Sequence, residues 1–314
     1  MRDLVLPQNL RDYCENEIRR GSKSFSLASR FFGRDVQTAV FAVYAWCRHC
    51  DDAIDRANSR KEQLQQLEEL ERQTRDAYAG TATSHPVFRS FQWVVHRYEI
   101  PQHYPLELLE GMRMDTQGFV YQSWNDLNLY CYRVAGVVGL MMTHIMGLRS
   151  ESALKNASDL GCAMQLTNIA RDVGEDLSLG RVYLPAEWLL EEGLDQNTLK
   201  IGIGHEAESQ KVLRVVKRML DQADALYASG VQGLPALHWR AALAVSVAQS
   251  VYREIGQLIR KQNARAWNQR TVVSVTRKGI CVMTGLLRLL KTVPVRFRSP
   301  WQSVKIQQVW RGTP

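Results

Sequence analysis

The stretch QLTNIARDVGED, residues 165–176, decides how the rest of the chain is interpreted. If it is helical, residues at steps of three, four and four share one face. That face carries Gln165, Asn168, Asp172 and Asp176. Carboxylates at positions i and i+4 repel each other, so a cation is expected between them. Mg²⁺ fits this need, because it binds through one or two carboxylates together with substrate phosphates and water.

A second acidic stripe lies about 120 residues earlier and has the same spacing. It consists of Tyr44, Arg48, Asp51 and Asp55. A single Asp pair of this kind is more often a solvated helix face. Here there are two such pairs. Each is flanked by apolar residues and has an Arg within one turn, Arg48 or Arg171. This arrangement favours a functional site instead. Arg binds phosphate oxygens in bidentate fashion. We therefore expect two acidic helices that face each other across a cavity and hold diphosphate through Mg²⁺.

The composition is that of a globular protein: 314 residues, of which 45% are hydrophobic and 23% charged. The N-terminus has no signal-peptide pattern, and no apolar run reaches the length of a membrane-spanning helix. The six cysteines are expected to be reduced thiols in a cytoplasmic protein. Cys47 and Cys50 form a C-x-x-C pair, but burial between helices accounts for them better than zinc or redox chemistry.

Helical periodicity runs through most of the chain, and few alternating strand patterns occur. We predict an all-α fold with residues 1–314 in one domain, which includes a basic peripheral tail from about residue 292. Asp126 is expected to cap a long apolar helix that ends at Met146. Gly136 and Gly139 lie inside that helix, where each costs about 1 kcal/mol relative to Ala. They are expected to admit a close helix or a bulky ligand.

Positive charge is concentrated at the C-terminal end. Residues 255–314 contain twelve Lys and Arg and no Asp or Glu. This imbalance predicts attraction to a polyanion. Phe297, Trp301 and Trp310 interleave with the basic residues, a mixture typical of a membrane interface. No nucleic-acid-binding signature is visible, so peripheral contact with a membrane surface is the interpretation that we favour over an ordinary solvated basic face.

Other chemistries find less support. A di-iron carboxylate bundle needs Glu-x-x-His pairs on facing helices, and none is found. Gly202 and Gly204 are only a fragment of a dinucleotide fingerprint, and no G-x-S-x-G nucleophile motif occurs. Apolar residues near the acidic helices can line a greasy tunnel or simply pack in a core. They are Val134, Val137, Val138, Met141, Leu160 and Met164.

Several motifs in this chain resemble those of the squalene and phytoene synthase family. The two aspartate-rich motifs correspond to DDAID at residues 51–55 and DVGED at residues 172–176. Further matches are SKSF at 22–25, YCY at 130–132 leading into VAG at 134–136, QLTN at 165–168, and GRVYLP at 180–185. They follow in order along most of the chain, and the similarity is greatest to bacterial, phytoene-forming members.

This resemblance implies the isoprenoid-synthase type of helical bundle around a central cavity. It assigns Mg²⁺, or Mn²⁺ in its place, to Asp51, Asp55, Asp172 and Asp176 with help from Asn168. Diphosphate contacts are implied for Ser22, Arg48, Gln165, Asn168 and Arg171. Tyr44, Tyr132 and Tyr252 are implied to lie along the reacting carbons. No nicotinamide is expected.

The implied reaction joins two geranylgeranyl diphosphates head to head, through prephytoene diphosphate, to phytoene in carotenoid biosynthesis. Contact with upstream and downstream carotenoid enzymes follows from that role. Two alternatives stay open. The first is a C30 enzyme that uses farnesyl diphosphate to make dehydrosqualene, or squalene with NADPH. The second is a catalytically silent relative that acts in assembly or binding, although such relatives are expected to lose the aspartates.

Overall fold

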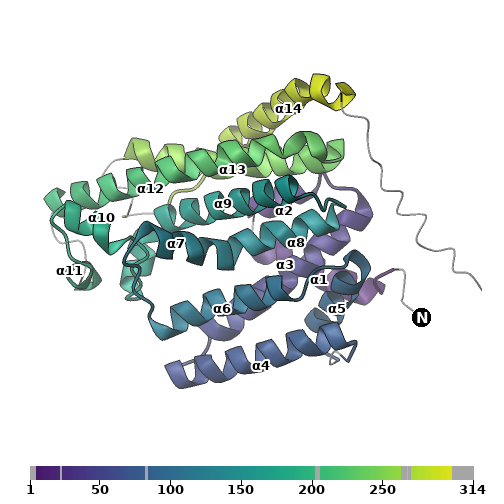
Figure 1. Cartoon of the computed structure of the whole chain (residues 1–314), viewed down its shortest axis with the longest axis horizontal. Helices are drawn as coiled ribbons and strands as arrows, with labels where there is room; N and C mark the ends of the chain where they lie inside the picture. The colour runs from purple at the N-terminus through teal and green to yellow at the C-terminus, as the bar shows by residue number, and fades with distance from the viewer. Residues whose placement is uncertain are drawn as a thin grey trace, which may run out of the picture.

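The computed structural model describes residues 5–21, 23–81, 84–201, 206–262, 267 and 270–298. Regular structure in these ranges is entirely helical, which confirms the predicted all-α class (Figure 1). The α-helices are α1 (Gln8–Gly21), α2 (Lys23–Ser29), α3 (Arg34–Asp55), α4 (Arg60–Ala79), α5 (Pro86–Tyr98), α6 (His103–Gln117), α7 (Trp124–Cys131), α8 (Val137–Ile145), α9 (Glu151–Ser178), α10 (Ala186–Glu191), α11 (Gln196–Ile201), α12 (Glu206–Gln232), α13 (Trp239–Gln262) and α14 (Val275–Arg298). A π turn, η1 (Tyr132–Gly136), and a 3-10 turn, η2 (Leu234–Ala236), complete the set.

Helix α9 lies near the middle of the bundle and packs against α12, α8 and α13 (Figure 1). Helix α3 packs instead against α1, α5 and α4. Helix α14 lies along α13 at one edge, and α4 lies at the opposite edge. The predicted tail from about residue 292 falls outside the described side chains, so its assignment and the single-domain assignment of residues 1–314 stay predictions.

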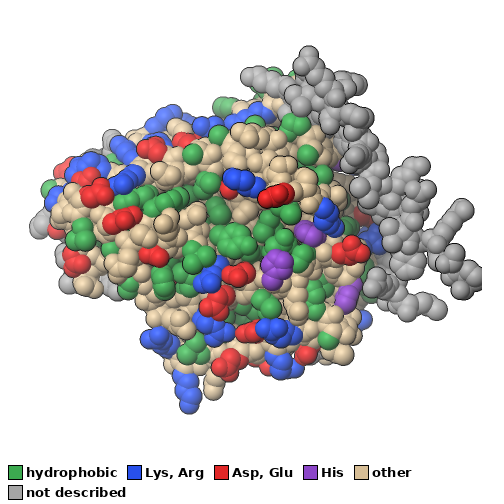
Figure 2. Space-filling model, in the orientation of Figure 1, with side chains coloured by type: hydrophobic (Ala, Val, Ile, Leu, Met, Phe, Trp, Pro, Cys, Tyr) green, Lys and Arg blue, Asp and Glu red, His purple; other side chains and the backbone are tan. Residues whose placement is uncertain are grey.

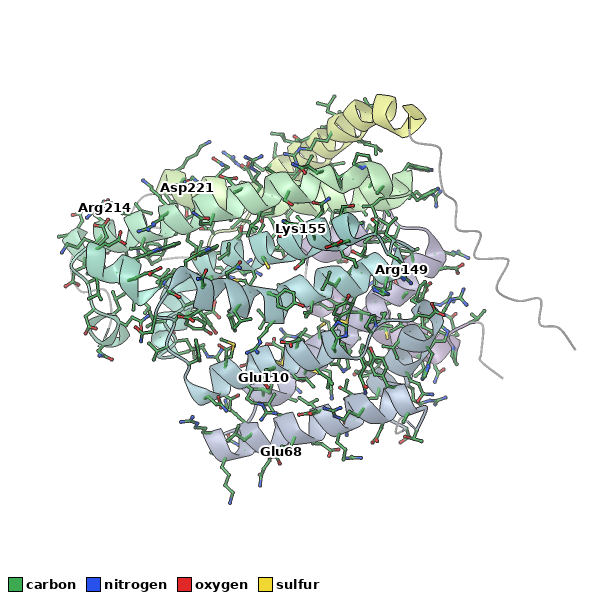
Figure 3. The ribbon with its side chains drawn as sticks, in the orientation of Figure 1. Glu68, Glu110, Arg149, Lys155, Arg214 and Asp221 are labelled. Carbon is green, nitrogen blue, oxygen red and sulfur yellow. The ribbon has the colours of Figure 1, made fainter. Side chains whose placement is uncertain are left out.

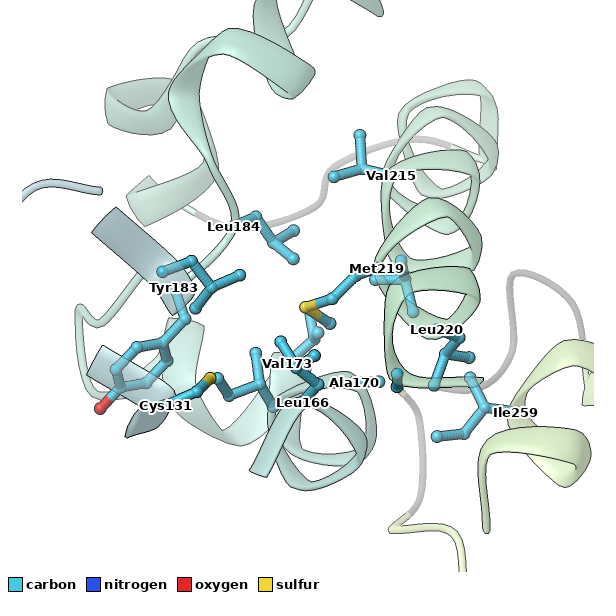
Figure 4. Close-up of a cluster of buried hydrophobic side chains, with 14 of the residues drawn as sticks. Cys131, Leu166, Ala170, Val173, Tyr183, Leu184, Val215, Met219, Leu220 and Ile259 are labelled. Atoms are coloured by element: carbon cyan, nitrogen blue, oxygen red, sulfur yellow. The ribbon is translucent and has the colours of Figure 1, made fainter. Parts of the chain in front are cut away.

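The two acidic helices belong to different hydrophobic clusters. In one cluster α9 packs against α12: Figure 4 shows Leu166, Ala170 and Val173 beside Met219 and Leu220. In the other, the apolar face of α3 packs around buried Trp46, whose ring stacks on Phe91. Each helix thus buries one face in its own cluster and leaves the other face to the space between them. Tyr132 contacts both clusters.

The long helix expected from Asp126 to Met146 is present as an unbroken run of α7, η1 and α8, but Asp126 does not cap it. Ser123 is the N-cap; its hydroxyl accepts from the backbone N–H of Asp126, whose carboxylate accepts from the backbone N–H of Ser123 in return. This reciprocal pair is a capping box, which begins the helix three residues before Asp126. The chain then widens into η1 before it continues as α8. Such π turns often occur at functional sites.

Glycines bring the backbones of α8 and α9 into direct contact. A Cβ atom at Gly139 would overlap the carbonyl group of Ala157, and one at Gly161 would overlap that of Ala135. The close helix predicted at Gly139 is therefore present. Because two crossing points fix α9 against the η1–α8 segment, the position of its acidic face relative to the rest of the bundle is fixed too.

Charged side chains lie on the outside of the bundle. In Figure 2 Lys, Arg, Asp and Glu are spread over the visible face with hydrophobic side chains between them. Glu68 on α4 and Arg214 and Asp221 on α12, labelled in Figure 3, are exposed. The acidic residues of the two motifs differ from these, because Arg side chains pair with Asp51, Asp55 and Asp172.

Candidate active site

Helix α3 presents its acidic motif at its C-terminal end. The guanidinium group of Arg48 lies 2.5 Å from a carboxylate oxygen of Asp52 and 3.3 Å from one of Asp51. Asp51 and Asp55 each expose about half of their side-chain surface. Partial burial, followed by the nearby charge of Asp55, raises the pKa of Asp51. These two carboxylates are thus close enough to repel each other and open enough to accept a cation.

The motif on α9 is more enclosed. Arg171 donates two hydrogen bonds to Asp172, of 2.8 and 2.5 Å, and Arg270 approaches the same carboxylate at 3.2 Å. Only 15% of the Asp172 side chain is exposed. Burial, followed by the charge of Asp172, raises the pKa of Asp176 to about 7. Two guanidinium groups therefore gather at one carboxylate, and both can also bind phosphate oxygens.

Arg181 connects the two acidic helices. It follows the C-terminal end of α9, and its guanidinium group donates to Asp55 of α3 over 3.3 Å. Its charge also lowers the pKa values of Asp51 and Asp176 against the stronger upward effect of burial. One cation thus interacts with carboxylates of both motifs, although their helices pack in different hydrophobic clusters.

The carboxylate of Asp115 interacts with the charge of Arg181. Tyr130 and Tyr183 donate hydrogen bonds of 2.8 and 2.9 Å to its two carboxylate oxygens. Burial raises the pKa of Asp115 to about 6 even though both hydroxyl groups lower it. The sequence patterns predicted no role for Asp115, Arg181 or Arg270. The only available signal was that Arg181 and Tyr183 lie in the matched GRVYLP segment.

A cavity of about 670 Å³ lies beside Arg171 and Arg270. Its lining follows one face of α9 from Ala153 to Arg171, a length of about 27 Å at 1.5 Å per residue. The residues at one end of this face are polar (Gln165, Asn168 and Arg171), and the others are mainly small or apolar, including Ala157 and Leu160. The cavity is therefore an elongated apolar pocket with a polar, cationic end.

The structure places some predicted residues on this cavity and not others. Tyr44, Gln165, Asn168, Arg171 and Tyr252 line it. Tyr132 and Arg48 are not among its lining residues, and Ser22 lies outside the described residues. The lining also lacks the four predicted metal-binding aspartates, Asp51, Asp55, Asp172 and Asp176. The roles implied for all the predicted site residues stay predictions.

Of the six apolar candidates, four line the cavity and two do not. Val134, Val138, Leu160 and Met164 belong to its wall. Val137 and Met141 are fully buried in the cluster around α3. Both alternatives left open for these six residues therefore occur, four in the cavity wall and two in the core.

The acidic motifs suit a metal that also uses substrate oxygens. Among the described residues, no group of three His, Cys, Asp or Glu side chains is close enough to hold a metal alone. Mg²⁺ does not require this, because one or two carboxylates with phosphate and water suffice. The side-chain oxygen of Asn168 is buried and accepts no hydrogen bond within the described part of the chain. Such an acceptor fits a cation or a water bound to one.

These features define a class of protein: an all-helical enzyme with an elongated apolar cavity whose polar end holds Asn168, Arg171 and Arg270, suited to a diphosphate ester with a long hydrocarbon chain. The squalene/phytoene synthase family model matches residues 18–278, and the chain belongs to that family.

Similar proteins include the 15-cis-phytoene synthase of Pantoea ananas, which is 42% identical over 90% of this chain and 94% of its own length. The 15-cis-phytoene synthase of a Paracoccus strain is 36% identical over 99% of this chain and 98% of its own. Among solved structures, a dehydrosqualene synthase superposes with a TM-score of 0.82 at 33% identity, covering 90% of this chain and 98% of that one.

Proposed function

We propose that this protein condenses two geranylgeranyl diphosphates head to head, through prephytoene diphosphate, to phytoene. The observation that carries the proposal is one continuous site, in which the apolar cavity along α9 ends at Asn168, Arg171 and Arg270. Relatives of similar length that are named 15-cis-phytoene synthase support the C40 product.

The polar end would hold the diphosphate. Arg171 and Arg270 already share one carboxylate, so their remaining N–H groups can donate to phosphate oxygens. Asp51, Asp55, Asp172, Asp176 and Asn168 would hold Mg²⁺, or Mn²⁺ in its place. When bound, the metal would neutralise charge on the departing diphosphate, and this electrostatic effect is usually a large part of catalysis.

The apolar part would protect the carbon skeleton. Departure of diphosphate leaves an allylic cation, which water would destroy. Small and aliphatic side chains from α8, α9 and α13 exclude water from the cavity wall. The double bond of the second substrate can then attack the cation, and loss of a proton gives the cyclopropylcarbinyl diphosphate. Tyr44 and Tyr252 line the same space and would lie beside these carbons.

A C30 enzyme is the second candidate, because the dehydrosqualene synthase structure is similar over almost its whole length. The two candidates differ in the substrate that the cavity accepts. Neither the proposed reaction nor dehydrosqualene formation needs a nicotinamide, whereas squalene formation needs NADPH as reductant.

The experiment supplies purified protein and Mg²⁺ with the C20 or the C15 diphosphate, each with and without NADPH, and identifies the products by mass spectrometry. We expect phytoene from the C20 substrate and no effect of NADPH. Reaction of the C15 substrate alone would replace the proposal with the C30 alternative. Folded protein that converts neither substrate would support the silent relative.

Matched variants test the acidic motifs. Asp51→Ala and Asp172→Ala should each lower turnover at least about 10²-fold, the scale of losing a major electrostatic contact in an active site. Glu68→Ala, at an exposed carboxylate on α4, serves as the control. Circular dichroism establishes that each variant is folded. Retained activity in either Asp variant would contradict the assignment of its motif.

A further inference from the structure

Part of the chain between α13 and α14 lies directly on α9, within its acidic motif. The point of contact is Gly174. A Cβ atom there would lie 2.8 Å from the backbone carbonyl oxygen of Trp267 and 3.4 Å from the Cβ atom of the same residue. The first distance is shorter than side chains tolerate, so only glycine lets this backbone approach α9 so closely. We call Trp267 and residues 270–273 the crossing segment.

Gly174 lies on the part of α9 that carries the proposed diphosphate contacts. It follows Arg171 by three positions, so the two residues are neighbours on the helix surface. Asp172 lies within the same turn of the helix. The contact at Gly174 therefore sets how closely the crossing segment approaches the polar end of the cavity.

The crossing segment brings Arg270 to that polar end. The guanidinium group of Arg270 lies 3.2 Å from the carboxylate of Asp172, and Arg270 lines the cavity together with residues 271–273. Arg270 exposes 57% of its side chain, and exposed ion pairs contribute little to holding two groups together. The position of Arg270 relative to α9 therefore depends mainly on how the backbone is held on either side of it.

Two anchors hold the backbone, one before and one after Arg270. The first is Trp267, which packs against the hydrophobic cluster of α9 and α12. Its indole N–H is buried and donates to no group in the described part of the chain, so packing holds this anchor. The second is the buried Thr271, whose hydroxyl donates a hydrogen bond of 2.8 Å to the side-chain oxygen of Gln262 at the end of α13.

We propose that Gly174 and Trp267 are positioning residues, which together set the distance between Arg270 and a diphosphate bound beside Arg171. This inference rests on the proposed diphosphate site, but it does not depend on the length of the hydrocarbon or on the product. A methyl group at position 174 would push the backbone of Trp267 away from α9. Arg270 follows three positions later and would move with it, although no group that contacts the ligand is changed.

Gly174→Ala should leave the helical bundle intact. Alanine is a better helix former than glycine, and the three atoms nearest to the new methyl group all belong to Trp267. The substitution therefore acts on the crossing segment rather than on the packing of α9. Thr271→Val, which removes the hydrogen bond of the other anchor, serves as a second variant. Circular dichroism establishes that each variant is folded.

The test measures binding of pyrophosphate in the presence of Mg²⁺ by titration calorimetry, with the full chain and without a prenyl substrate. Gly174→Ala and Arg270→Gln should each weaken binding at least about tenfold, the scale of a lost hydrogen bond to a charged group. The variant with both changes should bind within about twofold of Arg270→Gln alone, because the glycine acts through the arginine. Thr271→Val should weaken binding in the same direction.

Gly279→Ala is the control, since nothing lies within 4 Å of its Cβ position, and it should bind pyrophosphate like the parent. The proposal is overturned if Gly174→Ala binds pyrophosphate like the parent, or if the losses of the two single variants multiply in the double variant. If Gly174→Ala does not fold, unchanged binding by Thr271→Val overturns it instead. Product analysis with the C20 and C15 diphosphates remains a separate measurement, so failure of the proposed reaction and failure of this inference are distinguished.

Discussion

The guanidinium group of Arg181 lies 3.3 Å from the carboxylate of Asp55, 126 positions earlier in the sequence. This ion pair joins the segment after α9 to the end of α3. The two helices bury their apolar faces in different hydrophobic clusters. The contact therefore places one cation between the two halves of the candidate site, where metal and diphosphate are expected.

Arg181→Gln removes that cation while keeping a polar side chain of similar length. We expect kcat/KM to fall about 10²-fold, because the group acts on charge in the site. The melting temperature should change little, since exposed and half-exposed ion pairs contribute little to stability. Arg214→Gln, which breaks a distant pair with Glu192, is the control and should retain full activity. Equal activity of the two variants would remove Arg181 from the site.

Asn168→Ala tests the buried amide oxygen. The substitution removes an acceptor that has no hydrogen-bond donor in the described structure, so the protein without metal should lose little stability. In contrast, the Mg²⁺ concentration needed for half-maximal thermal stabilisation by pyrophosphate should rise at least about tenfold. Asn197→Ala, on the exposed surface of α11, provides the comparison. If both variants respond alike to Mg²⁺, Asn168 does not contribute to metal binding.

Asp115 should make folding stability depend on pH. Its pKa is about 6 in the folded protein and 3.8 as the ordinary value, so its contribution is fully favourable below pH 3.8 and is lost as pH rises through 6. Asp115→Asn cannot ionise. Relative to the parent, its free energy of unfolding should therefore increase from pH 4 to pH 7 by up to about 3 kcal/mol.

Tyr130→Phe provides a second test of the pKa of Asp115. Tyr130 donates to Asp115 and lowers its pKa, so removing the hydroxyl group should move the same pH window upward. Urea unfolding at several pH values measures both effects. A parent-to-Asn difference that is constant with pH would show that Asp115 is not the titrating group.

Gly139→Ala should destabilise the protein, because its methyl group would overlap the backbone of Ala157 on α9. Overpacking of this kind costs about 1–3 kcal/mol. Gly279→Ala is the matched control: nothing lies within 4 Å of its Cβ position, and Ala is favoured over Gly in a helix by up to about 1 kcal/mol. Chemical denaturation should therefore give opposite signs. A stabilised Gly139→Ala variant would show that α8 and α9 do not touch as described.

Ala157→Leu should shift substrate preference toward shorter chains. Ala157 lines the cavity on α9 about three turns from Asn168, away from the polar end. A larger side chain there shortens the space for the hydrocarbon. The ratio of kcat/KM for the C20 substrate over the C15 substrate should fall at least about tenfold, equivalent to about 1.4 kcal/mol. An unchanged ratio would place the end of the hydrocarbon elsewhere.

The sequence alone determined the helical class and the two acidic stripes, because a helix repeats every 3.6 residues and fixes which neighbours share a face. It also predicted Tyr44, Gln165, Asn168 and Arg171, all of which line the cavity. The Ser123 cap and the π segment η1 were missed. Local backbone geometry decides which residue is the N-cap. Asp126 has the right chemistry both for an N-cap and for the third helical position of a capping box, which it occupies here.

Only the tertiary structure decided which distant side chains complete the site and how large it is. Arg181, Arg270 and Asp115 lie outside both stripes, so their contribution depends on helix packing rather than on spacing. The same applies to the division of apolar residues between wall and core: Val138 lines the cavity while neighbouring Val137 is buried. Periodicity places a residue on a face, but only the packed helices determine whether that face meets another side chain or open space.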